Sequence, residues 1–439
     1  MKKYIIFIFL ISILAGCAKL DVDPTQSIAA DKAIRTPDDL NQALTGCYDA
    51  LQLSGFYGRH TVIAAELSSD NAQATGTILE YNDISLNNLL SNNTISEAIW
   101  SDCYIAINRV NNTLYYLPSV ENLADEDKND VEGQLLFIRS LAYYNLVRYF
   151  GDMPLKVTPT LSTDDINLPR TAVSEILAHI KDDLDFAAKN ISTKSAGRAQ
   201  AAAGEALLAK IARYESRWAD AETHASHVIE NYGLSLIDDY ESLFNNEGNA
   251  ESIFEVQFSD QDKNRMAEYL FPTSLGGRYE ASPSEDLVNA FGADDARLAV
   301  SLAGLADKPY CNKYNQISSG ADRVYVMRLA EMFLLRAEAR VKQEGDMLMI
   351  NDDINQIRQR AGLEAVDLQD YDALLDEILM QRRLEFSFEG QRWFDLIIND
   401  RAIQTLPNIT SSNQLLFPIP FSEINTNTAI GPANQNPGY

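Results

Sequence analysis

Residues 198–230 read RAQAAAGEALLAKIARYESRWADAETHASHVIE, and this segment indicates how the chain folds. It predicts two helices joined by a short turn, with apolar and small residues three to four positions apart: Leu208, Ala209, Ala212, Ser216, Trp218, Ala221, Ala225 and Val228. Small residues let two helices approach closely, and this register is typical of tetratricopeptide repeats. We therefore expect a scaffold of stacked helix pairs.

The same helical spacing recurs on both sides of this segment. Thr36, Pro37, Asp38 and Asp39 supply an N-cap, a first-turn proline and acids suited to a helix dipole. Further apolar stripes lie at 99–114, 135–150, 171–189, 325–342 and 351–361. Together these patterns predict a mainly α fold, a right-handed tetratricopeptide-like helical superhelix with long irregular loops and a few short strands.

Two long stretches, residues 55–95 and 232–322, break the helical pattern with Gly, Asn, Ser, Pro and aromatic residues. Within the second, Ile253–Phe258 alternates in the manner of a strand. Long irregular segments of compact proteins commonly carry function, because a helical frame presents them without itself changing. We therefore expect the ligand-binding site on these two stretches.

The N-terminus has the pattern of an export sequence. Lys2 and Lys3 precede an apolar run that is too short to span a bilayer. The run ends in Leu14-Ala15-Gly16-Cys17, which resembles the lipobox at which a bacterial lipoprotein is cleaved and its cysteine acylated. This resemblance predicts a signal peptide over residues 1–16, lipidation of Cys17, and a lipid anchor and tether over residues 17–35.

Composition limits the classes of ligand. The 439 residues are 46% hydrophobic, which supports a sizeable core, and carry a net charge of −27, or −29 once Lys2 and Lys3 are removed. That charge argues against nucleic acid and anionic lipid as ligands, so membrane attachment must come from the lipid. Cys47, Cys103 and Cys311 are too unevenly spread for a disulfide framework, and the first two are expected in the core.

Catalytic motifs are missing from the sequence. It contains no P-loop, G-x-G-x-x-G, G-x-S-x-G or H-E-x-x-H pattern. Glu385 and Glu389 could in principle form a pair of glycosidase carboxylates. They are flanked by aromatic residues, Phe386, Phe388 and Phe394, and share a helical face with basic ones, Arg382, Arg383 and Arg392. We therefore expect partly buried ion pairs that tie the last repeat to its neighbours. We expect Trp393 in the core. The sequence therefore predicts a protein that is not an enzyme.

Metal binding is not expected either. His224 and His227 have a ligand-like spacing, but they fall on the outer part of a repeat helix without a nearby cysteine. Asp125–Asp130 begins like a calcium loop, yet its sixth and twelfth positions, Asp130 and Leu136, do not fit one. We interpret this acid run as a helix start, and we predict no metal and no cofactor.

Several segments, in order along the chain, resemble the SusD/RagB family of outer-membrane lipoproteins: Leu20–Pro24, the Trp100-x-x-x-Tyr104-x-x-Ile107-Asn108-x-x-Asn111 pattern, Arg139–Tyr144, Tyr149–Pro154, Arg328–Ala339, Ile357–Leu363, Arg382–Leu396 and Gln435–Tyr439. The best of these signatures is Arg382–Leu396, RRLEFSFEGQRWFDL. The resemblance implies one compact unit with an N-terminal helical part (36–231), a loop-rich ligand-binding insert (232–322) and a C-terminal helical part (323–439).

The resemblance also implies a function. Members bind nutrient glycan, oligosaccharide or polysaccharide, at the cell surface and hand it to a SusC-like TonB-dependent outer-membrane barrel. Some relatives bind peptide, and this alternative stays open for the present chain. A loop-based glycosidase using carboxylates such as Asp70 and Glu80, and a purely structural lipoprotein, are the remaining alternatives.

Glycan recognition needs flat aromatic faces beside polar groups that satisfy sugar hydroxyls. The two irregular stretches supply such mixtures, and nine candidate ligand-binding residues follow: Tyr57, Arg59, Asp70, Tyr81, Asn92, Asn93, Tyr269, Arg278 and Tyr279. Trp100 belongs to a helical stripe and is expected to be buried, although its edge could meet a ligand.

Overall fold

The structure is a computed structural model that describes residues 34–245 and 249–439. The predicted signal peptide (1–16), the predicted lipidation site Cys17 and most of the predicted tether lie outside the described residues. Within those residues, no helix combines the length and the apolar character needed to cross a membrane.

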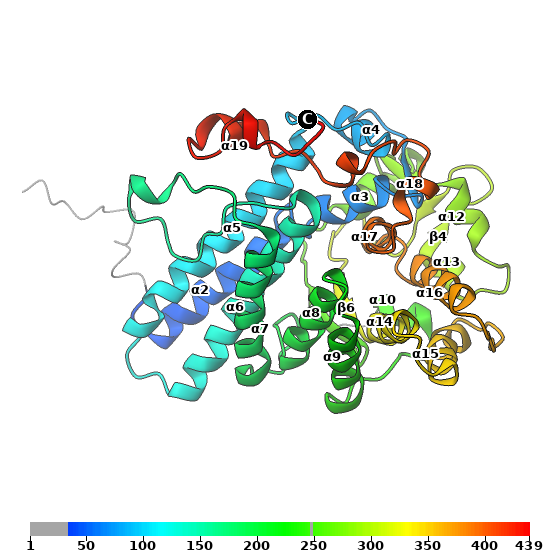
Figure 1. Cartoon of the computed structure of the whole chain (residues 1–439), viewed down its shortest axis with the longest axis horizontal. Helices are drawn as coiled ribbons and strands as arrows, with labels where there is room; N and C mark the ends of the chain where they lie inside the picture. The colour runs from blue at the N-terminus through cyan, green and yellow to red at the C-terminus, as the bar shows by residue number, and fades with distance from the viewer. Residues whose placement is uncertain (1–33, 246–248) are drawn as a thin grey trace, which may run out of the picture.

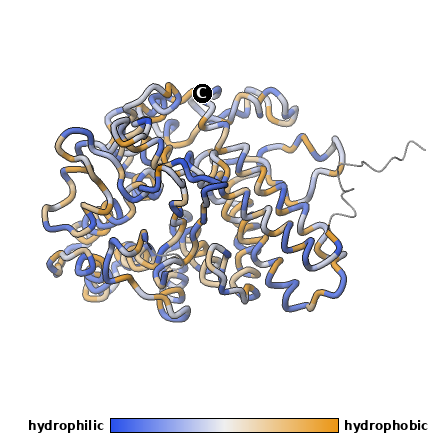
Figure 2. The backbone as a smooth tube through the Cα atoms, turned by 180° about the vertical axis from the view of Figure 1, so that it is seen from behind, coloured by the Kyte–Doolittle hydropathy of each residue, from blue (hydrophilic) through white to orange (hydrophobic). Residues whose placement is uncertain are grey.

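The scaffold is a series of helices in which each packs against the next (Figure 1). In order these are α2 (Pro37–Asp49), α5 (Thr94–Tyr116), α6 (Asp125–Phe150), α7 (Val173–Asn190), α8 (Ala201–Tyr214), α9 (Trp218–Asn231), α14 (Leu329–Lys342), α15 (Met347–Arg360) and α16 (Tyr371–Glu385). The predicted mainly α, tetratricopeptide-like fold is confirmed. Hydrophobic and hydrophilic residues alternate along these helices in Figure 2, as amphipathic helices require.

Local sequence explains where the scaffold begins. The Thr36 hydroxyl accepts a hydrogen bond from the Asp39 amide at 3.2 Å, and the Asp39 carboxylate accepts one from the Thr36 amide at 2.9 Å. Pro37 follows at the first helical position, where no amide hydrogen is needed. The predicted cap is therefore confirmed, with a second reciprocal bond that makes it a capping box.

Small residues set the spacing of the middle helices, as predicted from residues 198–230. A Cβ added at Gly204 of α8 would lie 3.1 Å from the Ala188 nitrogen of α7. Ala209, Ala221 and Ala225 are completely buried. Because these residues have small side chains or none, the helix backbones pack closely together.

One predicted helix start is wrong. Residues 324–328 form strand β6 (Val324–Arg328), which pairs antiparallel with β2 (Ser252–Val256), and α14 begins only at Leu329. The mostly apolar segment from Val324 to Leu335 is consistent with either structure, because a buried strand and a buried helix carry the same apolar residues. The strand predicted at Ile253–Phe258 is confirmed as β2.

The first irregular stretch leaves the scaffold after α2 and returns to it at α5. Since α2 and α5 pack against each other, the stretch leaves and rejoins the same pair of helices. After η2 (Ala50–Gln52) it contains α3 (His60–Leu67), β1 (Ala72–Ala74) and α4 (Leu79–Ser85). We call residues 53–93 the first excursion.

The second irregular stretch lies between α9 and α14, two helices that also pack against each other. Before β6 it contains α10 (Tyr240–Asn245), β2, α11 (Met266–Leu270), β3 (Ala281–Pro283), α12 (Glu285–Ala290), α13 (Arg297–Ser301), β4 (Leu302–Ala303) and β5 (Tyr310–Cys311). We call residues 232–323 the second excursion. After α16 the chain adds α17 (Arg392–Ile398), α18 (Ala402–Thr405) and α19 (Phe421–Thr426).

One large hydrophobic cluster joins both excursions to the scaffold. It includes Cys47, Cys103 and Trp393, each predicted in the core and each fully buried, together with Cys311.

Candidate ligand-binding site

The two excursions meet through a small antiparallel sheet. In it β1 of the first excursion pairs with β3 of the second, with Ala74 opposite Ala281. The buried Glu280 carboxylate accepts hydrogen bonds from the amides of Thr77 at 2.8 Å and Ile78 at 3.1 Å. Gly76 is needed beside it, because a Cβ there would lie 2.0 Å from that carboxylate. Segments some 200 residues apart therefore form one unit.

Four of the nine predicted residues gather at this meeting point: Arg59, Tyr81, Tyr269 and Arg278. The guanidinium carbon of Arg59 lies 3.8 Å from the centroid of the Tyr269 ring, and that of Arg278 lies 4.5 Å from it. Arg278 also donates a 2.9 Å hydrogen bond to the Tyr269 hydroxyl. Tyr81 meets Tyr269 edge to face, with ring centroids 6.3 Å apart.

These four residues form an inner and an outer layer. Arg59, Tyr81 and Tyr269 are buried, so the aromatic faces are covered by protein. Arg278 is the outer member, with 41% of its side chain exposed, and it forms an ion pair with Glu280 at 3.0 Å. In this arrangement the buried rings hold an exposed guanidinium in place.

Burial keeps the inner layer free of a second positive charge. His60 contacts both the Arg59 guanidinium, at 3.0 Å, and the Tyr81 hydroxyl, at 3.2 Å. Burial and then the positive charge of Arg59 lower the pKa of His60 to about 3, so the ring is neutral at physiological pH. The inner layer is thus a fixed support.

Tyr279 and two residues not predicted from the sequence complete the outer layer. Tyr279 is half-buried, and its hydroxyl donates to the Pro309 carbonyl at 3.1 Å. Arg265 and Glu268 form a bidentate ion pair with both distances 2.6 Å, and hydrogen bonding to Arg265 lowers the pKa of Glu268. We call Arg265, Glu268, Arg278 and Tyr279 the junction surface. Its planar donors, charged acceptor and aromatic ring suit sugar hydroxyls.

Tyr57 lies elsewhere. It is buried, stacks on Phe56 with centroids 4.7 Å apart, and accepts a hydrogen bond from Asn145 of α6 at 3.0 Å. It lines an inner cavity of about 20 Å³ together with Arg148. This space is about large enough for one water molecule.

Asp70 is held by two arginines of the C-terminal signature. Arg392 donates to both of its carboxylate oxygens, at 2.7 and 2.9 Å, and Arg383 lies 3.2 Å away. Burial alone would raise the pKa of Asp70, but the hydrogen bonds and charge of Arg392, with the charge of Arg383, lower it below its usual value. The residue therefore joins the first excursion to α16 and α17.

The two adjacent asparagines have different environments. Asn93 is buried and caps α5, where its side chain accepts hydrogen bonds from the amides of Ile95 and Ser96, both at 3.1 Å. Asn92 is exposed and lines a hollow of about 540 Å³ with Phe421 and Tyr439. Ligand contact by any of the nine residues stays a prediction.

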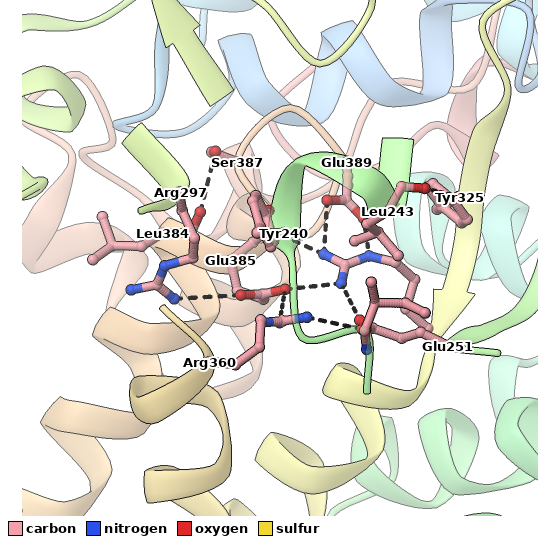
Figure 3. Close-up of polar contacts among 12 residues, drawn as sticks. Tyr240, Leu243, Glu251, Arg297, Tyr325, Arg360, Leu384, Glu385, Ser387 and Glu389 are labelled. Atoms are coloured by element: carbon pink, nitrogen blue, oxygen red, sulfur yellow. Dashed lines mark hydrogen bonds and ion pairs between the residues drawn. The ribbon is translucent and has the colours of Figure 1, made fainter. Parts of the chain in front are cut away.

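The acids and bases of the Arg382–Leu396 signature are buried ion pairs, as predicted, with some partners that the sequence did not indicate. Glu385 lies between Arg297 and Arg360 in Figure 3. Arg328 donates to Glu251, Glu385 and Glu389, at 2.7, 2.8 and 2.9 Å respectively. The carboxylates of Glu385 and Glu389 are each paired with at least two cationic side chains. Neither glutamate is therefore available for acid or base chemistry.

The Trp100–Asn111 signature and the α6 signature fix one turn. The side chains of Tyr104, Asn111 and Tyr143 donate to main-chain carbonyls of the segment after α6: to Pro154 at 2.7 Å, and to Lys156 at 2.9 and 2.8 Å. Both signature segments are therefore tied to the same turn.

The other polar patterns have structural partners. His224 and His227 both contact Glu205, at 2.8 and 3.1 Å. Asp125–Asp130 forms the first turns of α6, as predicted. In the described part of the chain, no group of three or more His, Cys, Asp or Glu side chains is arranged to hold a metal ion.

Comparisons with known proteins agree with this architecture. A family model described as "SusD family" matches residues 236–406, and a second, described as "Starch-binding associating with outer membrane", matches residues 20–214. SusD-like protein P2 of Formosa agariphila is 26% identical to this chain over the full length of both.

Solved structures share the fold. A SusD superfamily protein from Bacteroides vulgatus superposes with a TM-score of 0.84, at 26% identity, covering 92% of this chain and 99% of that one. A laminarin-binding SusD-like protein gives a TM-score of 0.83, at 24% identity, covering 92% and 100%.

The fold defines a tetratricopeptide-like helical protein whose two excursions combine into one surface. The chain belongs to the SusD/RagB family, which is associated with the outer membrane. The second family model is described as starch-binding, which is the description of a binding protein.

Proposed function

We propose that this protein is a cell-surface lipoprotein that binds nutrient glycan and delivers it to a SusC-like TonB-dependent outer-membrane transporter. Family membership, the laminarin-binding relative and the lipobox-like Leu14–Cys17 support this role. Acylated Cys17 anchors the chain to the membrane, and the helical scaffold needs no cofactor to present its excursions.

The observation that carries the proposal is the junction surface. Arg278 and Tyr279 contact the glycan there, and the buried Arg59, Tyr81 and Tyr269 position them. Asn92 contributes from its own exposed hollow. Tyr57, Asp70 and Asn93 act through the packing, ion pairs and cap that hold the first excursion.

A glycan array with soluble protein lacking residues 1–17 tests ligand class, with a reducing-sugar assay on every ligand found. We expect binding without release of reducing ends. Turnover of a bound glycan would contradict the proposal, and binding of peptides alone would show the other class of ligand known for the family.

The double substitution Arg265→Ala and Arg278→Ala tests the surface. Hydrogen bonds from charged groups contribute about 1.5–3 kcal/mol each, so we expect affinity to fall at least about tenfold. Arg217→Ala, an exposed arginine paired with Asp220 on α9, is the matched control and should bind like the unaltered protein.

Anchoring and partnership need separate measurements. Mass spectrometry of the mature protein should find acyl chains on residue 17, and Cys17→Ala should release the protein from membranes. Co-purification of the anchored protein with a TonB-dependent barrel tests the transporter partner. A mature protein that never co-purifies with such a barrel would contradict the delivery role.

A further inference from the structure

A separate hollow runs along the outer face of α5. It lies between α5, the segment 154–168 and α19, and has a volume of about 550 Å³. Figure 1 shows α19 above the upper end of α5. We call this hollow the α5 groove. None of the nine predicted residues lines it, and its size is within the range of small-ligand sites.

The walls of the α5 groove are fixed by hydrogen bonds. Tyr104 of α5 donates to the Pro154 carbonyl at 2.7 Å, and Lys156 donates to the Asp165 carbonyl at 2.6 Å. Asn427, directly after α19, donates to the Leu168 carbonyl at 2.9 Å. All three walls are tied together without a ligand, so binding need not order them.

The groove combines apolar surface with unused polar groups. Ile105 is 41% exposed and Ile166 is 57% exposed. Trp100 lies at the groove, and in the described part of the chain neither its indole N–H nor the Glu97 carboxylate forms a hydrogen bond. A ligand that fits must therefore present apolar faces together with groups that both donate and accept hydrogen bonds.

The charges in the groove disfavour an anionic ligand. Of its two bases, Arg109 is paired with Asp49, whereas Lys156 donates to a main-chain carbonyl and keeps its positive charge. The acids Glu97, Asp165 and Glu423 remain without a lysine or arginine within ion-pair distance among the described residues. Like charges repel, so the groove suits an uncharged polyhydroxylated ligand.

We infer that the α5 groove is a second binding site, for a short neutral oligosaccharide. The inference rests on the proposed function for its class of ligand, but it concerns a different surface. Ile105 and Ile166 supply the apolar contact, beside the small exposed part of Trp100, which is buried as predicted and only 5% exposed. Glu97 with Asn108 binds the hydroxyls.

Equilibrium titration of the mature lipoprotein in detergent, with the oligosaccharide found by the glycan array, tests this site. We expect two sites per chain. The double variant Glu97→Ala and Asn108→Ala should keep the site at the junction surface and lower the affinity of the α5 groove at least tenfold, so that one site is seen in the titration. Glu126→Ala with Asn129→Ala, on the first turns of α6, is the control pair and should leave both sites.

A second variant guards against an indirect effect. Ile166→Arg adds a bulky side chain from the opposite wall at an exposed position, and it should also remove one site without lowering the melting temperature. Arg265→Ala with Arg278→Ala should instead remove the other site and leave the groove.

The outcomes separate the two proposals. If both groove variants bind two oligosaccharides like the unaltered protein, the second site is wrong and the proposed function stands. If the unaltered protein binds no glycan, both proposals fall. If the groove variants bind the oligosaccharide like the unaltered protein but no longer bind a peptide, the ligand class inferred here is wrong.

Discussion

Asp70 shows how a residue that looks suited to ligand binding can have a structural role. Its carboxylate is held by Arg392 and Arg383, both mostly buried. Removing one partner of a buried ion pair leaves the other charge without compensation. We expect Asp70→Asn to lower the free energy of unfolding by about 3 kcal/mol, measured by denaturant titration.

The control for this change is Asp220→Asn. Asp220 pairs with Arg217 on the surface of α9, with half of its side chain exposed. Exposed ion pairs contribute less than about 1 kcal/mol, so stability should hardly change. Equal effects of the two substitutions would argue against the buried character of the Asp70 pair.

Glu66 predicts a pH dependence. It is fully buried on α3, and its carboxylate accepts hydrogen bonds from Asn71 at 2.9 Å and from the Gly390 amide at 2.8 Å. Burial raises its pKa to about 7, whereas an unfolded glutamate has a pKa of about 4.3. Between these values the folded state binds more protons than the unfolded state, so this group makes stability fall as pH rises from about 4.3 to about 7.

Glu66→Gln should remove that contribution. We expect the free energy of unfolding, measured from pH 4.5 to 8, to fall less steeply for the variant than for the unaltered protein below pH 7, and the two slopes to agree above it. Glu126→Gln, on the exposed start of α6, should keep the original slope. Parallel curves for Glu66→Gln and the unaltered protein would contradict the assignment.

At the scale of elements, Asn92 and Asn93 form a matched pair. Asn93 caps α5, whereas its exposed neighbour makes no comparable contact. Asn93→Ala should destabilise the protein by about 1 kcal/mol and leave glycan affinity unchanged. Asn92→Ala should leave the melting temperature unchanged. A fall in affinity without loss of stability for Asn93→Ala would show direct contact with ligand.

The helices could be predicted because their information is local. Thr36, Pro37 and Asp39 act within one turn, and Ala221 and Ala225 act within one helix face. The start of α14 was wrong because Tyr325 and Met327 suit a strand equally well, and only pairing with the distant β2 decides. The parts that depend on partners far along the chain could not be read from a periodic pattern.

The same reasoning explains the site. Tyr81, Tyr269 and Arg278 were selected as aromatic and polar residues in loops, and the structure brings them together. The burial of the two tyrosines could not be predicted, because it depends on how the two excursions pack. The α5 groove was missed since Glu97, Trp100 and Asn108 lie on a helix whose spacing indicates only a core stripe.

At the scale of the whole molecule, Arg328 connects separate parts of the chain. It joins Glu251 of the second excursion to Glu385, the last residue of α16, and to Glu389 in the turn that follows. Arg328→Met would leave these carboxylates short of a cation in a buried site. We expect a loss of at least about 4 kcal/mol in the free energy of unfolding, seen as a lower denaturation midpoint or as insoluble protein.

Arg401→Met is the matched control, since Arg401 pairs with Asp376 near the surface. It should cost less than about 1 kcal/mol. If Arg328→Met proved as mild as this control, the buried network would not be what holds the second excursion to the scaffold.

The packing of α2 against α5 has a consequence for how such proteins diversify. Because the first excursion leaves and rejoins one pair of helices that pack directly against each other, a loop of different length could be exchanged there without moving the frame. Asp70 and Arg392, however, are 322 positions apart and share one bidentate contact. A loop exchanged there must therefore keep Asp70, or a matching change must be made in α17, because each segment supplies half of one buried ion pair.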